Sequence, residues 1–479
     1  MDFTAAYQHA SVDCIAFSPG STFVAYIAGH VGNAVLVRVS GTLQVVRSWE
    51  LDQPLHSLQW SQDGLLLLAS SLNRCESSAA MRRTSGVSYV LPLDPDACLP
   101  DGSDDQRGWV ARIDAGVQGL HSAAWLPVWR IPSIVQFAPF DVGGMVYTLS
   151  DKTVTPVPNT VLQNVYSNPL WPNHFALVQR NREHDYLTLY TPKPLEAGSA
   201  AHPVEWFCEK SIRLHTNRVQ GVAWSPSGDY IAAWDHNVEF RVCVYSLGGT
   251  HLTTVCLAPD AKFDIPTSRI PVSAAECQAA LSGPRSSVGR ARRVAKESGS
   301  SQRKTVEQTV LPVDPPQSSS TPDAPPKKGV CWMEWNHDGT LLACRNESLP
   351  TTMFVYEFVR LQGRATDARL RLCAVVVLAA PITAATWKPG SSHVLSFVDG
   401  GRSMYMWTGP DEHADVPVPR ADAAQQGAEA IAVPNDHFSA HRITWAPDGH
   451  SVVLSDRHTF CCAVTAPADD TEVQGDLAA

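Results

Sequence analysis

The 479-residue sequence has no long apolar run, no paired cysteine spacing and no excess of positive charge. A membrane-spanning helix needs about 18 or more consecutive apolar residues, so the sequence predicts no membrane span. The first residues, MDFTAAYQHA, show neither the basic nor the apolar segment of a secretory signal, and we expect none. The formal net charge of −10 argues against general nucleic-acid binding, because phosphate neutralisation needs a basic surface.

The 12 cysteines are scattered from Cys14 to Cys462 without the clustering of a disulfide framework or a zinc site. Most lie in apolar runs, such as Cys243 in RVCVYSL, where cysteine acts as a small core residue. We therefore expect a reducing, cytosolic compartment.

Motifs of catalysis and ligand binding are also missing. We find no P-loop, no G-x-G-x-x-G before a helix, no H-E-x-x-H and no G-x-S-x-G. His437 and His441 have helical spacing but no third ligand, and Cys461 and Cys462 are adjacent on a strand, where side chains point to opposite faces. We expect no catalytic, cofactor-binding or metal-binding residue, and hence no enzyme and no cofactor.

What the sequence does contain is one phrase that recurs eight times: an aromatic residue, a turn such as Ser-Pro-x-Gly, and a second apolar run. The clear copies are CIAFSPGSTFVAYI from Cys14, SLQWSQDGLLLLAS from Ser57, GVAWSPSGDYIAAW from Gly221, WMEWNHDGTLLACR from Trp332, AATWKPGSSHVLSF from Ala384 and RITWAPDGHSVVLS from Arg442, and weaker copies begin at Ser122 and Asn168. The aromatic positions are Phe17, Trp60, Trp125, Trp171, Trp224, Trp335, Trp387 and Trp445.

Each copy predicts a β-hairpin, because apolar alternation surrounds a Pro/Gly turn. A third strand ending in an aromatic follows, as in SMYMWT, and often a fourth, as in LQVVRSWE. Four strands per repeat indicate a β-propeller blade, whereas a β-sandwich does not repeat one turn phrase at this period. We interpret Asp63, Asp338 and Asp448 as turn residues. Trp234-Asp235 has the two letters of the WD dipeptide but is expected to end the second strand of its repeat. The signature position of a WD repeat is the end of the third strand.

We therefore predict an all-β propeller of seven or eight blades with a long disordered inter-blade loop. Blades occupy residues 1–280, with a polar insert at about 71–108, and residues 329–466. Residues 281–328, rich in Ser, Pro and charge, form the disordered loop, and 467–479 form an acidic tail. The stretch 413–430 is expected to be a surface loop. A strand within 3–10 is expected to complete the last blade.

Several stretches resemble one group of proteins, the spindle-pole and centrosomal WD-repeat proteins of the WRAP type (the "WD-repeat protein eight" family). These stretches are GVAWSPSGDYIAAWDHNVEFRVCVYSLGG from Gly221, ACRNESLPTTMFVYEF from Ala343, FALVQRNREHDYLTLY from Phe175, ARIDAGVQGLHSAAW from Ala111 and SDRHTFCCAV from Ser455. They occur in the family's order. The chain departs from the family after Leu257, where such proteins carry a further repeat.

The resemblance implies a non-catalytic adaptor at the centrosome, spindle pole or basal body, supporting microtubule minus-end anchoring, spindle assembly and cilium formation. It also implies a coiled-coil centriolar-satellite or spindle-pole partner and a minus-end-directed kinesin. Seven Lys/Arg lie between Arg285 and Lys304. They form either a solvated linker, a patch for an acidic partner such as a microtubule surface, or a cryptic nuclear-localisation signal. The alternative is a WD-repeat substrate receptor or assembly factor in ubiquitin ligation, RNA processing or chromatin.

Overall fold

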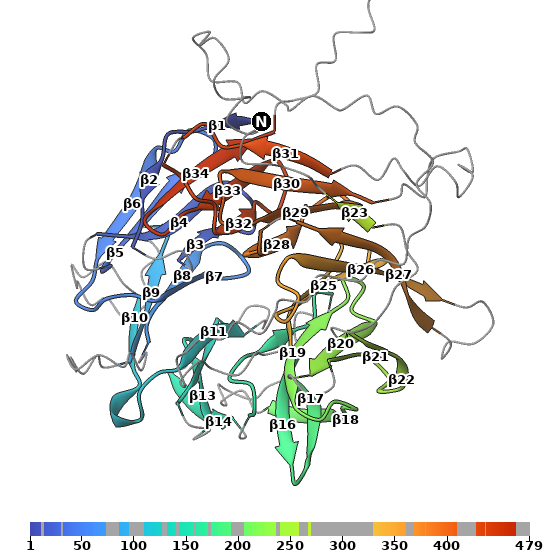
Figure 1. Cartoon of the computed structure of the whole chain (residues 1–479). Helices are drawn as coiled ribbons and strands as arrows, with labels where there is room; N and C mark the ends of the chain where they lie inside the picture. The colour runs from blue at the N-terminus through green and yellow to red at the C-terminus, as the bar shows by residue number, and fades with distance from the viewer. Residues whose placement is uncertain are drawn as a thin grey trace, which may run out of the picture.

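The computed structural model describes residues 1–10, 14–29, 32–72, 86–94, 110–126, 132–139, 143–150, 152–157, 160–170, 174–192, 206–235, 240–257, 267–269, 329–360, 368–378, 380–409, 428–435 and 437–465. Within these ranges every regular element is a β-strand except one 3₁₀ turn, Gly116–Gln118. The strands form eight sheets arranged around a ring (Figure 1). We number these sheets as blades 1 to 8 in chain order.

Blades 1 to 4 are four-stranded antiparallel sheets. Blade 1 consists of β3 (Ile15–Phe17), β4 (Phe23–Ala28), β5 (Ala34–Val39) and β6 (Val45–Glu50). Blade 2 consists of β7 (Ser57–Trp60), β8 (Leu66–Ser71), β9 (Val87–Pro92) and β10 (Ala111–Asp114). Blade 3 consists of β11 (Ser122–Leu126), β12 (Ser133–Phe137), β13 (Gly144–Thr148) and β14 (Thr153–Val157). Blade 4 consists of β15 (Tyr166–Ser167), β16 (Phe175–Asn181), β17 (His184–Pro192) and β18 (Trp206–Arg213).

Blades 5 to 8 follow the same plan, with additions to two of them. Blade 5 consists of β19 (Val219–Trp224), β20 (Tyr230–Asp235), β21 (Arg241–Ser246) and β22 (His251–Cys256). Blade 6 consists of β24 (Val330–Trp335), β25 (Leu341–Asn346), β26 (Thr352–Arg360) and β27 (Ala368–Val377), and β23 (Thr267–Arg269) adds a fifth strand. Blade 7 consists of β28 (Ala384–Trp387), β29 (Val394–Val398), β30 (Ser403–Thr408) and β31 (Ala428–Ala432).

Blade 8 is built from both ends of the sequence. Its three C-terminal strands are β32 (Arg442–Trp445), β33 (Ser451–Ser455) and β34 (Thr459–Val464). Two short strands, β1 (Asp2–Phe3) and β2 (Tyr7–Gln8), pair antiparallel with the outer edge of β34. The prediction that an N-terminal strand completes the last blade is confirmed. The N-terminal strands thus take the fourth-strand position of blade 8. The ring therefore closes without a three-stranded blade.

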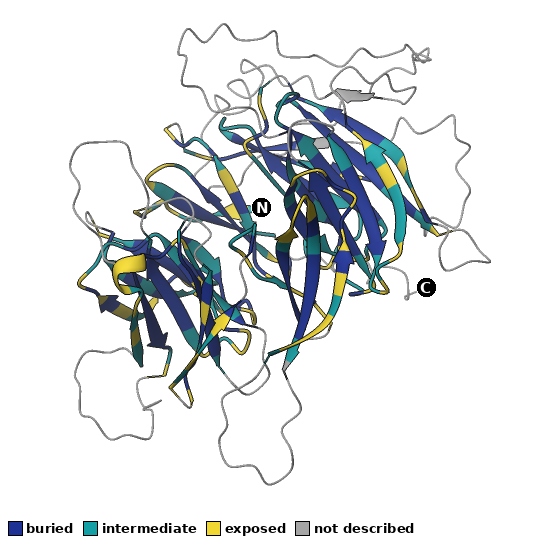
Figure 2. Ribbon diagram, turned by 90° about the horizontal axis from the view of Figure 1, so that it is seen from below, coloured by how far each residue is buried: buried dark blue, intermediate teal, exposed yellow. Residues whose placement is uncertain are grey.

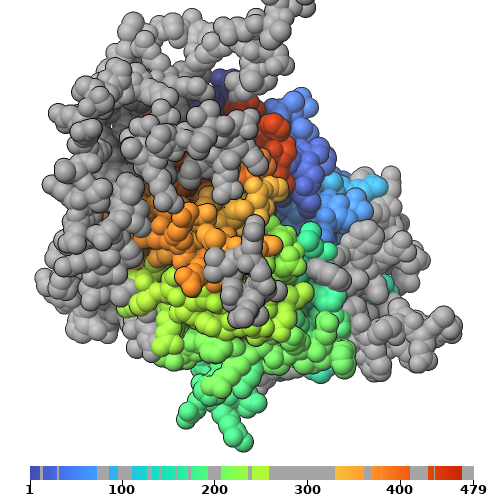
Figure 3. Space-filling view, turned by 90° about the vertical axis from the view of Figure 1, so that its right-hand side faces the viewer, coloured from blue at the N-terminus to red at the C-terminus, as the bar shows by residue number. Residues whose placement is uncertain are grey.

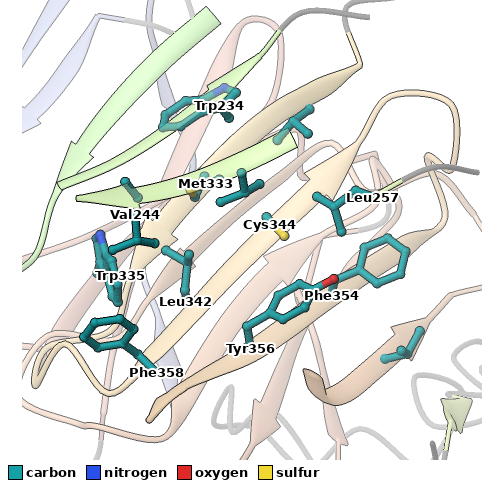
Figure 4. Packing of buried hydrophobic residues seen from close by; sticks show 14 of the residues in the cluster. Trp234, Val244, Leu257, Met333, Trp335, Leu342, Cys344, Phe354, Tyr356 and Phe358 are labelled. Carbon is teal, nitrogen blue, oxygen red and sulfur yellow. The ribbon is translucent and has the colours of Figure 1, made fainter. Parts of the chain in front are cut away.

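The core of the protein lies between blades. Eight clusters of buried apolar side chains are described, and each spans one seam between two neighbouring blades, including the seam between blades 8 and 1. Figure 2 shows buried residues along the strands and exposed residues mainly at turns and edges. The largest cluster, with sixteen buried residues, fills the seam between blades 5 and 6 (Figure 4). These two blades also adjoin in the space-filling view (Figure 3).

Three sequence-based expectations need adjustment. The blade number is eight, which decides between the two values left open. The inner strand of blade 4 is Tyr166–Ser167, so the weak copy was aligned wrongly on Trp171, which lies between β15 and β16 and outside the described residues. Residues 428–430, expected in a loop, belong to β31. The predicted disordered loop 281–328 and tail 467–479 lie outside the described residues.

Candidate protein-interaction surface

The recurring tryptophan of the repeat ties neighbouring blades together near the ring centre. Its indole Nε1–H donates to a backbone oxygen of the preceding blade's innermost strand. The bonds run from Trp60 to Ala16 (3.1 Å), Trp125 to Gln59 (3.3 Å), Trp224 to Tyr166 (3.2 Å), Trp335 to Ala223 (3.4 Å) and Trp387 to Glu334 (3.0 Å). In four of the five, the acceptor immediately precedes the aromatic of its own blade, so one sequence phrase supplies both donor and acceptor.

Three of the eight seams show no such bond among the described residues. One is the seam between blades 3 and 4, because the inner strand of blade 4, Tyr166–Ser167, carries no tryptophan. Blade 1 has Phe17 at the position, and phenylalanine has no donor. The Nε1–H of Trp445 is buried without a hydrogen-bond partner among the described residues. The two exceptions at Phe17 and Trp445 flank blade 8. The blade that joins the chain ends is therefore held less by indole bonds and more by the paired N-terminal strands.

The residues singled out in the turns have structural roles. The Oδ1 of Asp63 accepts from Ser61 Oγ and, at 3.0 Å, from the backbone N–H of Leu65, and that of Asp448 accepts from the N–H of His450 at 2.9 Å. Such bonds are typical of Asx turns. Trp234-Asp235 ends β20, the second strand of its blade, as predicted from the sequence.

The histidines and cysteines near the C-terminus do not come together. The backbone N–H of His437 donates to Asn435 Oδ1 at 3.1 Å, while His441 Nε2 lies 4.0 Å from Asp456 Oδ1. In the part of the chain that the structure describes, no three His, Cys, Asp or Glu residues are placed to hold a metal ion. Cys461 packs in the seam between blades 7 and 8 and Cys462 in that between 8 and 1, so they point to opposite faces. Burial raises the pKa of each thiol to about 12.

One carboxyl near the ring centre was not anticipated. Glu334 on β24 accepts a hydrogen bond from Thr386 Oγ1 on β28 at 3.2 Å and is partly buried. This burial raises its pKa to about 7, so the group is partly protonated at neutral pH. The signal in the sequence was weak, because the equivalent positions of the strong copies carry Ala16, Gln59 and Ala223.

Eight large apolar side chains among the described residues are exposed, on strands and connecting turns from blade 1 to blade 4. They are Val45, Val46, Leu65, Val117, Met145, Val154, Leu170 and Phe207. Four of these belong to blades 3 and 4, where Phe207 on β18 is 60% exposed and Val154 on β14 is 53% exposed. Exposed apolar groups on a rigid rim suit contact with another protein. The described residues also contain no helix long and apolar enough to cross a membrane.

Comparison with known proteins agrees with the repeat. The family model "WD domain, G-beta repeat" matches residues 206–240, which run from β18 through β19 and β20. The chain is an eight-bladed WD-repeat β-propeller. Along nearly its whole length this propeller is similar to WD repeat-containing protein WRAP73 of Mus musculus, with 22% identity over 96% of this chain and 95% of that protein. The resemblance to WRAP-type proteins is confirmed.

Two solved structures are also similar. One is the Cps50 (Swd1) β-propeller domain of Myceliophteria thermophila, at 9% identity and a TM-score of 0.43, covering 96% of this chain and 100% of that one. The other belongs to a mitotic checkpoint complex, at 10% identity and a TM-score of 0.42, covering 97% of this chain and 92% of that one.

Proposed function

We propose that this propeller is a non-catalytic adaptor at the centrosome, spindle pole or basal body, where it supports minus-end anchoring of microtubules, spindle assembly and cilium formation. The observation that carries the proposal is the similarity to WRAP73 over 96% of the chain. The family resemblance then implies a coiled-coil centriolar-satellite or spindle-pole partner, a minus-end-directed kinesin and a cytoskeletal location.

The site's chemistry fits binding better than catalysis. The reactive groups are embedded in seams: the thiols of Cys461 and Cys462 are protonated at neutral pH, and Glu334 is bonded to Thr386. The exposed groups are apolar, and binding energy at protein interfaces is concentrated in a few such anchors, above all aromatic ones. Among the described residues Phe207 is the large exposed aromatic of the rim, and it is the anchor we expect a partner to contact.

The test follows a fluorescent fusion through mitosis and identifies the proteins that co-purify with it. The proposal expects focal signal at the poles and recovery of a coiled-coil satellite or spindle-pole protein. Phe207→Ala is expected to weaken that recovery about tenfold or more, as an anchor would. Val46→Ala, also exposed but on blade 1, is the matched control. A diffuse nuclear signal with ligase, RNA-processing or chromatin subunits would contradict the proposal and favour the alternative.

A second experiment concerns the basic run 285–304, which lies outside the described residues. If it contacts the acidic microtubule surface, its deletion weakens microtubule co-sedimentation at low salt and spares partner binding. Loss of both activities together would contradict this separation of roles.

A further inference from the structure

The outer edge of blade 6 carries a strand that the repeat does not account for. β23 pairs with β27 in parallel, with Thr267 opposite Val375, Ser268 opposite Val376 and Arg269 opposite Val377 (Figure 1). All other pairings among the described strands are antiparallel. β23 also lies where the family resemblance leads one to expect a whole repeat. The edge of β27 therefore accepts an added strand from outside its own blade.

The added strand covers only a small part of this edge. β27 is ten residues long, whereas β23 has three, and residues 368–374 have no described strand on that side. The sequence around β23 reads IPTSRIP, with Pro266 and Pro271 on its two sides. Proline has no N–H to donate to a ladder, so these residues limit how far the chain's own strand can extend. A longer segment from elsewhere would form more ladder bonds.

The uncovered half of the edge is basic. Along β27, Leu370 and Leu372 pack toward the core between blades 5 and 6, while Arg369 and Arg371 are exposed. Arg360 ends the neighbouring strand, and Glu357 forms an ion pair with Arg371. Arg360 lies over the ring of Tyr230 in blade 5, so the charged groups at this edge are Arg369, Arg371 and Glu357. They carry one net positive charge in a chain whose net charge is −10. An incoming strand with carboxylates opposite Arg369 and Arg371 would be complementary in charge.

We propose that the outer edge of β27 is a strand-addition site for an extended acidic segment of a protein partner, and that β23 is an internal competitor that occupies part of it. Binding proceeds by displacement of β23 and growth of a longer ladder along β27. Main-chain bonds supply affinity and the two exposed arginines supply selectivity. A partner cannot bind while β23 occupies the edge, so its apparent affinity falls in proportion to the fraction of molecules whose edge is free. A change in the stability of the β23 pairing would therefore change the partner's affinity.

The test uses peptides added to the full-length chain. Each peptide spans residues 261–273 with Pro266→Val and Pro271→Val. An acidic version also carries Ala261→Glu and Phe263→Glu, which continue the β23 register to positions opposite Arg369 and Arg371. A basic version carries lysine at the same two positions. The double variant Ser268→Pro, Arg269→Pro is designed to detach β23 from β27. Proline has no backbone N–H, so two consecutive prolines remove a donor to the ladder whichever of the two residues has its N–H directed at β27.

The acidic peptide is expected to bind the released variant about tenfold or more tighter than the wild type, and tenfold or more tighter than the basic peptide binds it. Amide hydrogen exchange at 375–377 should accelerate in the variant and slow again with the acidic peptide. A control pair, Ser286→Pro with Ser287→Pro, should behave as wild type. No binding to the released variant, equal binding of the two peptides, or equal binding to variant and wild type would overturn the proposal.

Discussion

Two seams join blades 1–5 to blades 6–8, and they are built differently. Between blades 5 and 6 lie sixteen buried residues, with the Trp335 indole bonded to the backbone of Ala223. Between blades 8 and 1 the cluster has eight, and Phe17 offers no donor. Here the chain uses polar and aromatic links instead: the N–H of Asp448 donates to Ser21 Oγ at 2.9 Å. The seam between blades 5 and 6 thus has twice as many buried apolar residues as the closing seam, and the closing seam adds specific polar and aromatic links.

The N-terminal strands supply most of those links. The ring of Tyr7 on β2 packs against that of Phe460 in blade 8, tilted by 30° with 5.6 Å between the centroids. The guanidinium of Arg38 in blade 1 lies 4.8 Å from the centroid of the same tyrosine ring. His9 is buried, and its Nε2 donates toward the backbone oxygens of Asp456 (2.9 Å) and Thr459 (3.2 Å). One short segment thus contacts both blades of the closing seam.

The largest effect is expected in the apolar seam. Trp335→Ala removes a side chain that is 5% exposed, and large-to-small aromatic changes in cores cost about 3–5 kcal/mol of unfolding free energy. Urea unfolding followed by circular dichroism measures it. Leu65→Ala, at a position 59% exposed, is the control and should change the value by about 0.5 kcal/mol or less. Equal stability of the two variants would show that Trp335 is not a core residue.

A smaller effect is expected at the closing seam. Tyr7→Ala removes one aromatic contact and one cation–π contact, together about 1–2 kcal/mol. Gln8→Ala, the exposed neighbour on the same strand, should be nearly neutral. Hydrogen exchange localises the change, which is expected in β34 and the first strands of blade 1. Uniform acceleration throughout the ring would instead mean that the two kinds of seam do not differ.

The indole bond can be isolated by a matched pair. Trp387→Phe keeps an aromatic ring but removes the 3.0 Å bond to Glu334, with an expected loss of about 1 kcal/mol beyond the change in packing. Trp445→Phe removes a buried N–H that has no described acceptor, so it should cost about 1 kcal/mol less than the first substitution. Thermal unfolding of both variants provides the difference. A larger loss for Trp445→Phe would contradict the assignment of the unpaired donor.

The smallest expected effect depends on pH. Burial lowers the pKa of His9 below its ordinary 6.5, with His458 contributing in the same direction, and its Nδ1 has no described partner for a proton. The unfolded chain therefore binds more protons here, so stability is full above pH 6.5 and falls as the pH drops through that range. His9→Gln should show a weaker decline between pH 7.5 and 5.5 than the wild type. Identical slopes would rule out a contribution from His9.

The repeat made much of this fold predictable from sequence. The turn phrase is local, with proline and glycine at fixed offsets, so it identified the hairpin strands of most blades. Blade 4 failed because its inner strand has only two residues, Tyr166–Ser167, and the nearby Trp171 imitated the pattern. The pairing of β1 and β2 with β34 was expected only because the last copy lacked a fourth strand.

The surface features were less predictable, for a physical reason. The parallel pairing of β23 with β27 joins residues over 100 positions apart, and three residues carry no periodicity that could reveal it. The basic edge formed by Arg369 and Arg371 depends on which face of β27 is exposed. The raised pKa of Glu334 depends on burial between two blades, which the sequence around it does not show.

Strands from both ends of the sequence close one ring, whose halves meet at two seams. The direct measurement is cleavage at a protease site inserted within residues 281–328, followed by size-exclusion chromatography of the product. The two fragments are expected to elute together as one particle, because the seams between blades 5 and 6 and between blades 8 and 1 remain intact. Separation of the fragments under native conditions would contradict it.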